Sequence, residues 1–399
     1  MMMSHTSLRD KAASLLAPAD VRIDGPRVWD LRVRHDEFFP RVLADGSLGL
    51  GESYMDGWWD CQRLDEFFYR ILRARVDTKV ACGSLLVDFI KAKLFNVQRA
   101  SRAFQIGKRH YDIGNALFEC MLDRRWIYSC GYWDQAATLD EAQEAKLDLI
   151  ARKLLLRPGL TVLDIGCGWG GTARFLAERY QVRVVGVTVS EEQARYGREL
   201  CRGLPVDIRL QDYRKVEGEF DRILSVGMFE HVGAKNYDAF LRIVRSHLKD
   251  DGLFLLHTIG KNRSSHHVDP WIEKYIFPNS MLPSASQVSR ATEGRFVLED
   301  WHNFGVDYDK TLTAWFHNFD AHWPDLQRQY DERFYRMWKY YLLSCAGAFR
   351  ARRLQVWQMV LSPTGVSNGY RAPQREPVEM AMSAGPATAS FADDRQPNW

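Results

Sequence analysis

The segment VLDIGCGWGG at residues 162–171 constrains the fold most, because an apolar run leads directly into a glycine-rich turn. Gly166, Gly168 and Gly170 lack side chains, so a nucleotide-like ligand can approach the backbone where the strand ends. Five short apolar runs, separated by helix-like segments, are predicted as strands: 161–165, 182–189, 206–211, 220–227 and 252–259. Strands that alternate with helices predict an α/β fold, with a mainly parallel sheet and helices on both faces.

Polar residues follow the predicted strands at the sheet edge where such folds bind ligands. The second strand leads to Thr188 and Gln193, where a nucleotide-binding sheet usually places an acid, and Asp212 follows the third. These side chains can hydrogen-bond to a ribose or an adenine, although an exposed turn carboxylate is the alternative for Asp212. Glu230 follows the fourth strand and His257 lies on the fifth. Their proximity predicts an active site, with a satisfied core histidine as the alternative.

Composition excludes several classes of protein. Hydrophobic residues make up 46% of the 399 residues and charged residues 26%, as in ordinary packed domains. The net charge of +3 is too small to indicate nucleic-acid binding. No apolar run reaches the roughly 18 residues of a membrane-spanning helix, and the first residues lack the apolar core of a secretory signal. The seven cysteines include no C-x-x-C pair, so a cytoplasmic protein without a metal site is expected.

Three regions are predicted along the chain. Residues 1–105 are expected to form a smaller, mostly helical N-terminal domain that contacts lipid, and residues 106–372 the main domain. In the main domain, Thr138 and Glu141 form a capping-box pattern that predicts a helix ending at Pro158. The last region, 373–399, contains four prolines and five alanines without apolar periodicity, which predicts a disordered tail.

Two segments of the N-terminal region allow two interpretations each. The run GSLGLGESYMDGWWD at 46–60 supplies large aromatic side chains, which fit a small core or a lipid-facing wedge. Residues 91–110 contain six basic residues, no acid and interleaved apolar residues. Such a segment can bind an anionic membrane surface, or it can be a solvated helix face followed by a linker.

The glycine pattern distinguishes between two nucleotide-binding families. A dinucleotide dehydrogenase has G-x-G-x-x-G, a spacing that residues 166–171 also meet, but they carry one further glycine and read G-x-G-x-G-G. The form D-x-G-C-G-x-G resembles the first motif of class I S-adenosylmethionine-dependent methyltransferases. A methyltransferase is therefore the favoured interpretation, and an NAD-dependent dehydrogenase or a purely structural turn are the alternatives.

Motifs between about residues 40 and 370 resemble those of the cyclopropane-fatty-acyl-phospholipid synthases and the related mycolic acid cyclopropane synthases. They are GSLGLGESYMDGWW, HYDIGN (110–115), YSCGYW (128–133), VLDIGCGWGG, VVGVTVS, GMFEHVGAKNYD, FLLHTIG, VDPWIEKYIFPN (268–279), EDWHNFGVDYDKTL (299–312) and AGAFRAR (346–352). The resemblance implies a class I methyltransferase (Rossmann-like) fold with S-adenosylmethionine as methyl donor. The implied reaction converts the cis double bond of an unsaturated acyl chain in a membrane phospholipid into a cyclopropane ring, with bound bicarbonate as the general base.

The resemblance also assigns roles to residues of this chain. The bicarbonate ligands correspond to Cys130, Glu230, His257, the Ile259 backbone and Tyr308. Cys345 matches a cysteine sometimes proposed as catalytic, although a cysteine in an apolar helix-like stretch is normally core. The expected cofactor-binding residues are Tyr128, Ser129, Asp164, Gly166, Gly168, Gly170, Thr188, Gln193, Asp212, Tyr213 and Phe229. The candidate walls that shield a cationic centre from water are Tyr111, Tyr128, Trp133 and Phe229.

The expected setting is the inner face of a membrane, where the enzyme binds peripherally to an anionic surface and forms a homodimer. Two other functions stay open at this point. A sister methyltransferase on the same fold can make a methyl-branched or methylene acyl chain, and an inactive relative can bind lipid only. None of the glycines is lost, and Cys130, Glu230 and His257 are present, which disfavours the inactive relative.

Overall fold

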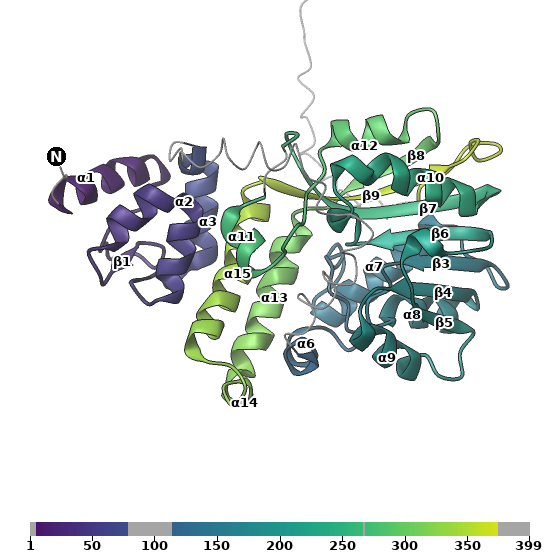
Figure 1. Cartoon of the computed structure of the whole chain (residues 1–399), viewed down its shortest axis with the longest axis horizontal. Helices are drawn as coiled ribbons and strands as arrows, with labels where there is room; N and C mark the ends of the chain where they lie inside the picture. The colour runs from purple at the N-terminus through teal and green to yellow at the C-terminus, as the bar shows by residue number, and fades with distance from the viewer. Residues whose placement is uncertain (1–4, 79–113, 266–267, 374–399) are drawn as a thin grey trace, which may run out of the picture.

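The computed structural model describes residues 5–78, 114–265 and 268–373 (Figure 1). The basic segment 91–110 and nearly all of the predicted tail therefore lie outside the described residues, as does the predicted domain boundary at 105. Within the described residues, no helix has both the length and the apolar character needed to cross a membrane.

A seven-stranded sheet forms one end of the molecule, with the strand order β5-β4-β3-β6-β7-β9-β8 (Figure 1). Strands β3 to β7 are mutually parallel, while β9 pairs antiparallel with both β7 and β8. The strands are β3 (Thr161–Ile165), β4 (Arg183–Thr188), β5 (Val206–Leu210), β6 (Phe220–Val226), β7 (Leu248–Lys261), β8 (Val297–Asn303) and β9 (Leu354–Ser362). The five predicted strands are confirmed. The last two were not predicted from the sequence.

Helices cover both faces of this sheet because neighbouring strand residues point to opposite sides. Leu163 packs in a core with α10 and α12, whereas Val162 packs in a core with α7, α8 and α9. These helices are α7 (Leu139–Lys153), α8 (Gly171–Tyr180), α9 (Glu191–Leu200), α10 (Tyr237–His247) and α12 (Ala285–Thr292). The predicted capping box of Thr138 and Glu141 is present at the start of α7. The helix ends at Lys153, before the predicted end at Pro158, because the chain turns through Leu155 at a φ of +49°.

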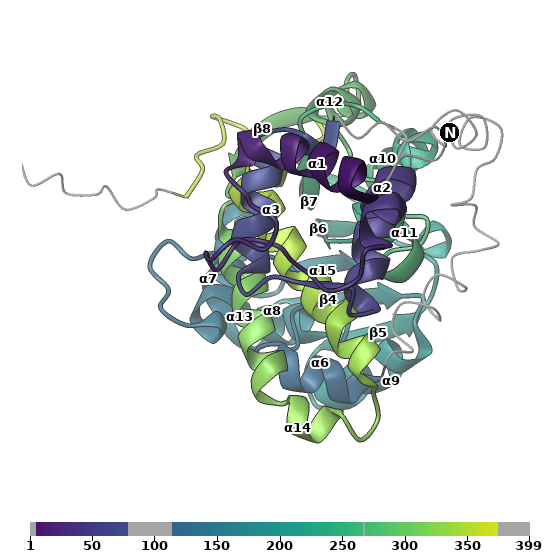
Figure 2. The same cartoon turned by 90° about the vertical axis from the view of Figure 1, so that its left-hand side faces the viewer.

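The N-terminal residues form three helices and a short ribbon, seen end-on in Figure 2. These are α1 (His5–Leu16), α2 (Phe38–Met55), α3 (Leu64–Arg73), β1 (Arg32–Val33) and β2 (Trp59–Asp60). Five further helices lie between them and the sheet or beside it: α6 (Asn115–Met121), α11 (Pro270–Tyr275), α13 (Asp307–Ala321), α14 (Trp323–Leu326) and α15 (Glu332–Arg350). The short 3₁₀ turns are η1 (Ala17–Ala19), η2 (Val76–Thr78), η4 (Tyr213–Lys215), η5 (Phe229–His231) and η6 (Ala234–Asn236).

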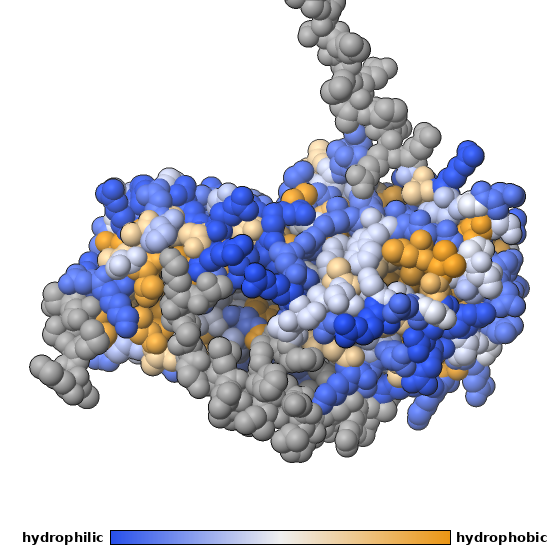
Figure 3. All heavy atoms as spheres, turned by 90° about the horizontal axis from the view of Figure 1, so that it is seen from above, coloured by the Kyte–Doolittle hydropathy of each residue, from blue (hydrophilic) through white to orange (hydrophobic). Residues whose placement is uncertain are grey.

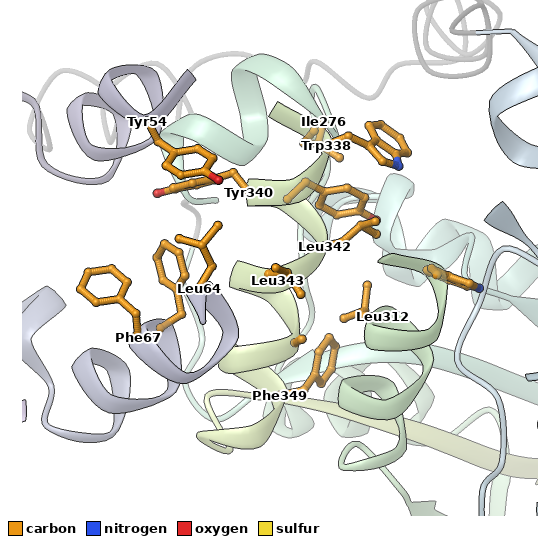
Figure 4. Packing of buried hydrophobic residues seen from close by; sticks show 14 of the residues in the cluster. Tyr54, Leu64, Phe67, Ile276, Leu312, Trp338, Tyr340, Leu342, Leu343 and Phe349 are labelled. Atoms are coloured by element: carbon orange, nitrogen blue, oxygen red, sulfur yellow. The ribbon is translucent and has the colours of Figure 1, made fainter. Parts of the chain in front are cut away.

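The aromatic residues of segment 46–60 belong to a hydrophobic core, and this supports the core interpretation over the lipid-facing wedge. Trp59 is fully buried and Tyr54 is 2% exposed. The Tyr54 ring lies 5.6 Å from Tyr340 of α15, and Tyr340 lies 4.5 Å from Trp271 of α11. Figure 4 shows Tyr54 and Phe67 on the N-terminal helices facing the side chains of α15. The N-terminal helices and α15 therefore share one continuous core.

The outer surface is mainly hydrophilic on the face shown in Figure 3, with apolar side chains in separate patches. Large hydrophobic residues that are exposed include Val297 and Leu298 on β8, at 43% and 49%. Because β8 is the edge strand of the sheet, its outer side packs against no further strand among the described residues. This exposure explains why β8 lacks the continuous apolar pattern by which the inner strands were recognised.

Candidate active site

A pocket opens at the carboxyl ends of β3, β4, β5 and β6. It is lined by nine of the residues expected to bind the cofactor: Tyr128, Ser129, Asp164, Gly166, Gly168, Thr188, Gln193, Asp212 and Tyr213. Gly170 and Phe229 are absent from the lining. Gly170 begins α8 and packs near Gly197 of α9, and Phe229 stacks on Tyr237 at 4.2 Å inside the sheet core.

The glycine turn leaves its backbone open to the pocket. Gly166, Gly168 and Gly170 have φ values of +86°, +55° and +85°, in the left-handed region that glycine favours. A Cβ on Gly168 would meet no described heavy atom within 4 Å, whereas a Cβ on Gly166 would lie 2.8 Å from Met228. Space beside Gly168 is therefore available to a ligand that lies against the turn.

Strands β4 and β5 lead into a network of polar side chains. Thr188 Oγ1 donates to Gln193 Oε1 at 2.8 Å and accepts from the Ser190 amide at 3.2 Å. Asp212 is 5% exposed, and its Oδ1 accepts from the Arg214 amide at 3.0 Å. Asp212 is thus a buried residue of the pocket wall, which disfavours the alternative of an exposed turn carboxylate.

Asp164 gives the pocket a buried acid at the end of β3. It is 2% exposed, and Oδ2 has no hydrogen-bond partner among the described residues. Burial raises the pKa of Asp164 to about 7, and the nearby Lys146 ammonium opposes this rise. A ligand that brings hydrogen-bond donors or positive charge would satisfy this carboxyl group. S-adenosylmethionine carries both, so the residues present fit it.

A second group of predicted residues lies beyond the pocket, and we call it the buried donor cluster: Cys130, Glu230, His257, Ile259 and Tyr308. Glu230 Oε1 accepts from the Ile259 amide at 2.6 Å, which joins the turn after β6 to β7. Val226 of β6 pairs with His257 of β7, so His257 lies at the same sheet edge. Burial raises the pKa of Tyr308.

Burial favours the neutral forms of the ionisable side chains of the cluster. It raises the pKa of Glu230 to about 7 and lowers the pKa of His257 well below its ordinary value. It also raises the pKa of the Cys130 thiol and of the Tyr308 hydroxyl. Glu230 Oε2 has no hydrogen-bond partner among the described residues, although it is buried. Neutral side chains can donate hydrogen bonds to a small anion without placing a second negative charge beside it.

Cys345 lies on α15 and is partly buried. Burial raises the pKa of its thiol to about 12, so the thiolate required of a nucleophile is disfavoured. This environment is the one expected from the core interpretation of the sequence.

Aromatic side chains line the region around the cluster. Tyr128 lies 5.1 Å from Trp315 and 5.3 Å from Phe118, and its hydroxyl hydrogen-bonds to Tyr341 at 2.8 Å. Trp133 Nε1 donates to Thr311 at 2.9 Å. Tyr111 lies outside the described residues. Of the expected wall residues, Tyr128 therefore packs against two aromatic residues that sequence reasoning missed, Trp315 and Phe118.

Two buried polar residues near the site were also missed. Lys146 of α7 is fully buried and donates to Ser129 Oγ at 2.8 Å. Gln358 of β9 is fully buried, pairs with His257 in the sheet, and brings Nε2 within 3.3 Å of His257 Nδ1. A lysine inside an amphipathic helix pattern gave no signal of its own. A glutamine inside the apolar run VWQMV was a signal, because central strands rarely bury an amide without a partner.

Comparisons with known proteins identify the family. The family model described as "Mycolic acid cyclopropane synthetase" matches residues 98–359. The chain belongs to this family. It is 55% identical over 363 residues to the cyclopropane-fatty-acyl-phospholipid synthase of Escherichia coli (strain K12), a match that covers 90% of this chain and 94% of that protein.

Solved structures of the cyclopropane synthase family share the fold. The cyclopropane synthase MmaA2 from Mycobacterium tuberculosis is 32% identical with a TM-score of 0.62, and the match covers 65% of this chain and 97% of that one. The mycolic acid cyclopropane synthase CmaA1, solved in complex with SAH and CTAB, is 34% identical with a TM-score of 0.61. This match also covers 65% of this chain and 97% of that one. The chain thus has the predicted class I methyltransferase fold and is an S-adenosylmethionine-dependent methyltransferase.

Proposed function

We propose that this enzyme transfers a methylene group from S-adenosylmethionine to the cis double bond of unsaturated acyl chains in membrane phospholipids. The product is a cyclopropane ring, and a bound bicarbonate serves as the general base. The identity of 55% to the phospholipid synthase of Escherichia coli, over 90% of this chain, supports the substrate class.

The observation that carries the proposed chemistry is the buried carboxyl group of Glu230. Oε1 is held by the Ile259 amide at 2.6 Å, and Oε2 has no partner among the described residues. With its pKa raised to about 7, Glu230 can donate a hydrogen bond through Oε2 near neutral pH. The hydroxyl of Tyr308 adds a second neutral donor, whereas the thiol of Cys130 donates to the Gly131 carbonyl oxygen at 3.2 Å. Bicarbonate, a small oxyanion, fits this donor set.

S-adenosylmethionine supplies an electrophilic methyl group when bound, and bicarbonate supplies a base. The residues of the chain must then position a weakly nucleophilic alkene and keep water away from the cationic carbon that forms. Tyr128, Trp315 and Phe118 offer aromatic faces, which attract positive charge and carry no nucleophile aimed at it. Proton removal from the new methyl group, followed by ring closure, completes the reaction.

Mass spectrometry of phospholipids tests this proposal. Lipids with unsaturated chains are incubated with the enzyme and S-adenosylmethionine, and the acyl chains are analysed for a +CH₂ species that no longer contains a double bond. If the product is a methyl-branched or methylene chain instead, the enzyme is a sister methyltransferase and the cyclopropane product is ruled out. The absence of any +CH₂ product, with S-adenosylmethionine bound, would contradict the proposal.

The proposed setting is the inner face of the membrane, where residues 91–110 bind anionic lipid and two copies of the chain form a homodimer. This part rests on the sequence alone, because the segment lies outside the described residues. Each basic residue near an anionic surface contributes on the order of 1 kcal/mol at low salt. Sedimentation of the purified chain at several concentrations tests the homodimer.

A vesicle assay tests the membrane surface. Glutamine replacements of Lys91, Lys93, Arg99 and Arg102 should weaken binding to anionic vesicles far more than to zwitterionic ones. The matched control replaces four exposed arginines on the sheet domain, Arg195, Arg202, Arg209 and Arg242, which removes the same charge elsewhere. An equal loss for both sets of replacements, or on both vesicle types, would contradict the assignment.

A further inference from the structure

A fully buried lysine lies beneath the wall between the cofactor pocket and the buried donor cluster. Lys146 on α7 has no exposed surface, and its ammonium donates to Ser129 Oγ at 2.8 Å. A buried ammonium is costly to desolvate, and burial lowers the pKa of Lys146 to about 8 although the charge of Asp123 opposes this fall. The position of Lys146 therefore calls for a reason other than stability.

The chemistry of the contact fixes the direction of the Ser129 hydroxyl. An ammonium group has three donors and no acceptor, so Ser129 Oγ must accept from Lys146. The hydroxyl hydrogen of Ser129 is then left to donate, and no described residue accepts it. Ser129 lines the cofactor pocket together with Asp164, whose Oδ2 also has no partner among the described residues. A ligand in the pocket can therefore satisfy both groups.

A second buried side chain of α7 holds the same backbone segment. Gln143 lies one turn before Lys146, and its Nε2 donates to the carbonyl oxygens of Ser129 at 2.8 Å and Ile127 at 3.4 Å. The segment from Ile127 to Ser129 brings Tyr128 and Ser129 to the pocket, and the next residue is Cys130 of the buried donor cluster. Helix α7 thus fixes the backbone that connects the two parts of the site.

We propose that Lys146 is a positioning residue for the methyl donor. Its ammonium holds Ser129 as a hydrogen-bond donor that faces an acceptor atom of S-adenosylmethionine. Gln143 fixes the backbone on which that donor sits. The role does not depend on the proposed lipid substrate or on bicarbonate, because it concerns only the cofactor pocket.

Binding of S-adenosylhomocysteine to the full-length enzyme, measured by calorimetry, tests the role of Lys146. Lys146→Met should weaken binding about ten-fold or more, and Ser129→Ala should weaken it by a similar factor. The double variant should bind S-adenosylhomocysteine no more weakly than whichever single variant has the lower affinity, because both changes remove the same hydrogen-bond donor. Thermal unfolding should show that Lys146→Met stays folded at the assay temperature, although Asp123 and Asp164 lose a buried cation.

Lys153→Met is the matched control, because Lys153 is the other buried lysine of α7 and, unlike Lys146, pairs with a residue outside the pocket lining. Its ammonium pairs with Asp300 at 2.8 Å, so this variant should lose stability and keep its affinity for S-adenosylhomocysteine. Wild-type affinity in folded Lys146→Met, or losses that multiply in the double variant, would overturn the proposal. If Lys146→Met does not fold, Ser129→Ala alone decides, and unchanged affinity in it would also overturn the proposal.

Discussion

The cofactor pocket and the buried donor cluster adjoin at one edge of the same sheet, yet they are built in different ways. The pocket is formed by strand ends and a glycine turn, and Gly168 leaves free space beside its backbone. The cluster is formed by side chains with raised or lowered pKa values, held in an apolar interior. The difference shows how one sheet edge can bind a large polar ligand through its backbone and control a proton through burial.

The largest expected effect comes from closing the pocket at Gly168. Gly168→Val should abolish S-adenosylhomocysteine binding in calorimetry, because a branched side chain would fill the space against which the ligand lies. Gly203→Val is the control, since Gly203 also has a positive φ, of +82°, with open space around it, and lies outside the pocket lining. It carries the same backbone strain and should keep wild-type affinity. Retained affinity in folded Gly168→Val would show that the pocket is assigned wrongly.

A change in the cluster should separate turnover from cofactor binding. Glu230→Gln preserves size but prevents the side chain from exchanging a proton, and His257→Ala removes the imidazole. Both variants should bind S-adenosylhomocysteine like the wild type and lose about 10²-fold or more in turnover, as is typical when acid–base machinery is removed. Parallel losses of binding and turnover would show that the two regions are not distinct.

The two regions also differed in how far they could be predicted from the sequence. The pocket depends on local patterns, so VLDIGCGWGG and the strand ends identified Gly166, Gly168, Thr188, Gln193 and Asp212, and the family resemblance added four more of its residues. The cluster joins segments up to about 180 residues apart, and only the family resemblance connected Cys130 with Tyr308. Lys146 and Trp315 were missed because their importance arises from burial, which a sequence pattern does not show for single polar or aromatic residues.

The same limit applies to the fold. The parallel strands β3 to β7 were predicted because they are continuous apolar runs between helices. Strands β8 and β9 were missed because β8 is an exposed edge strand and β9 follows the long helix α15 with polar residues in its sequence, Gln355 and Gln358. The shared core of the N-terminal helices and α15 depends on contacts between distant residues, such as Tyr54 and Tyr340.

A smaller effect should appear in the pH dependence of stability. The folded-state pKa of Glu230 is raised to about 7 from 4.5, so the folded protein holds this proton more tightly than the unfolded chain. Stability from this group is fully present below pH 4.5 and is lost as the pH rises through 7. The difference in unfolding free energy between Glu230→Gln and the wild type should therefore grow by about 2 to 3 kcal/mol from pH 5 to pH 8.

Urea unfolding of both proteins at the two pH values measures this difference. Glutamine does not titrate, so it serves as the pH-independent reference for the same buried site. A constant difference between pH 5 and pH 8 would show that Glu230 is not held as a neutral acid near pH 7.

The most direct test of the whole account is the activity of bicarbonate-depleted enzyme before and after bicarbonate is added back. Tyr308→Phe removes one neutral donor from the cluster and leaves the pocket lining unchanged. Depleted wild-type enzyme should be inactive and recover fully with added bicarbonate. Tyr308→Phe should recover only partly, with a requirement for about ten-fold more bicarbonate, as expected when one hydrogen bond to a charged group is lost. Full activity of both proteins after rigorous depletion would contradict the account, because a side chain would then be the base.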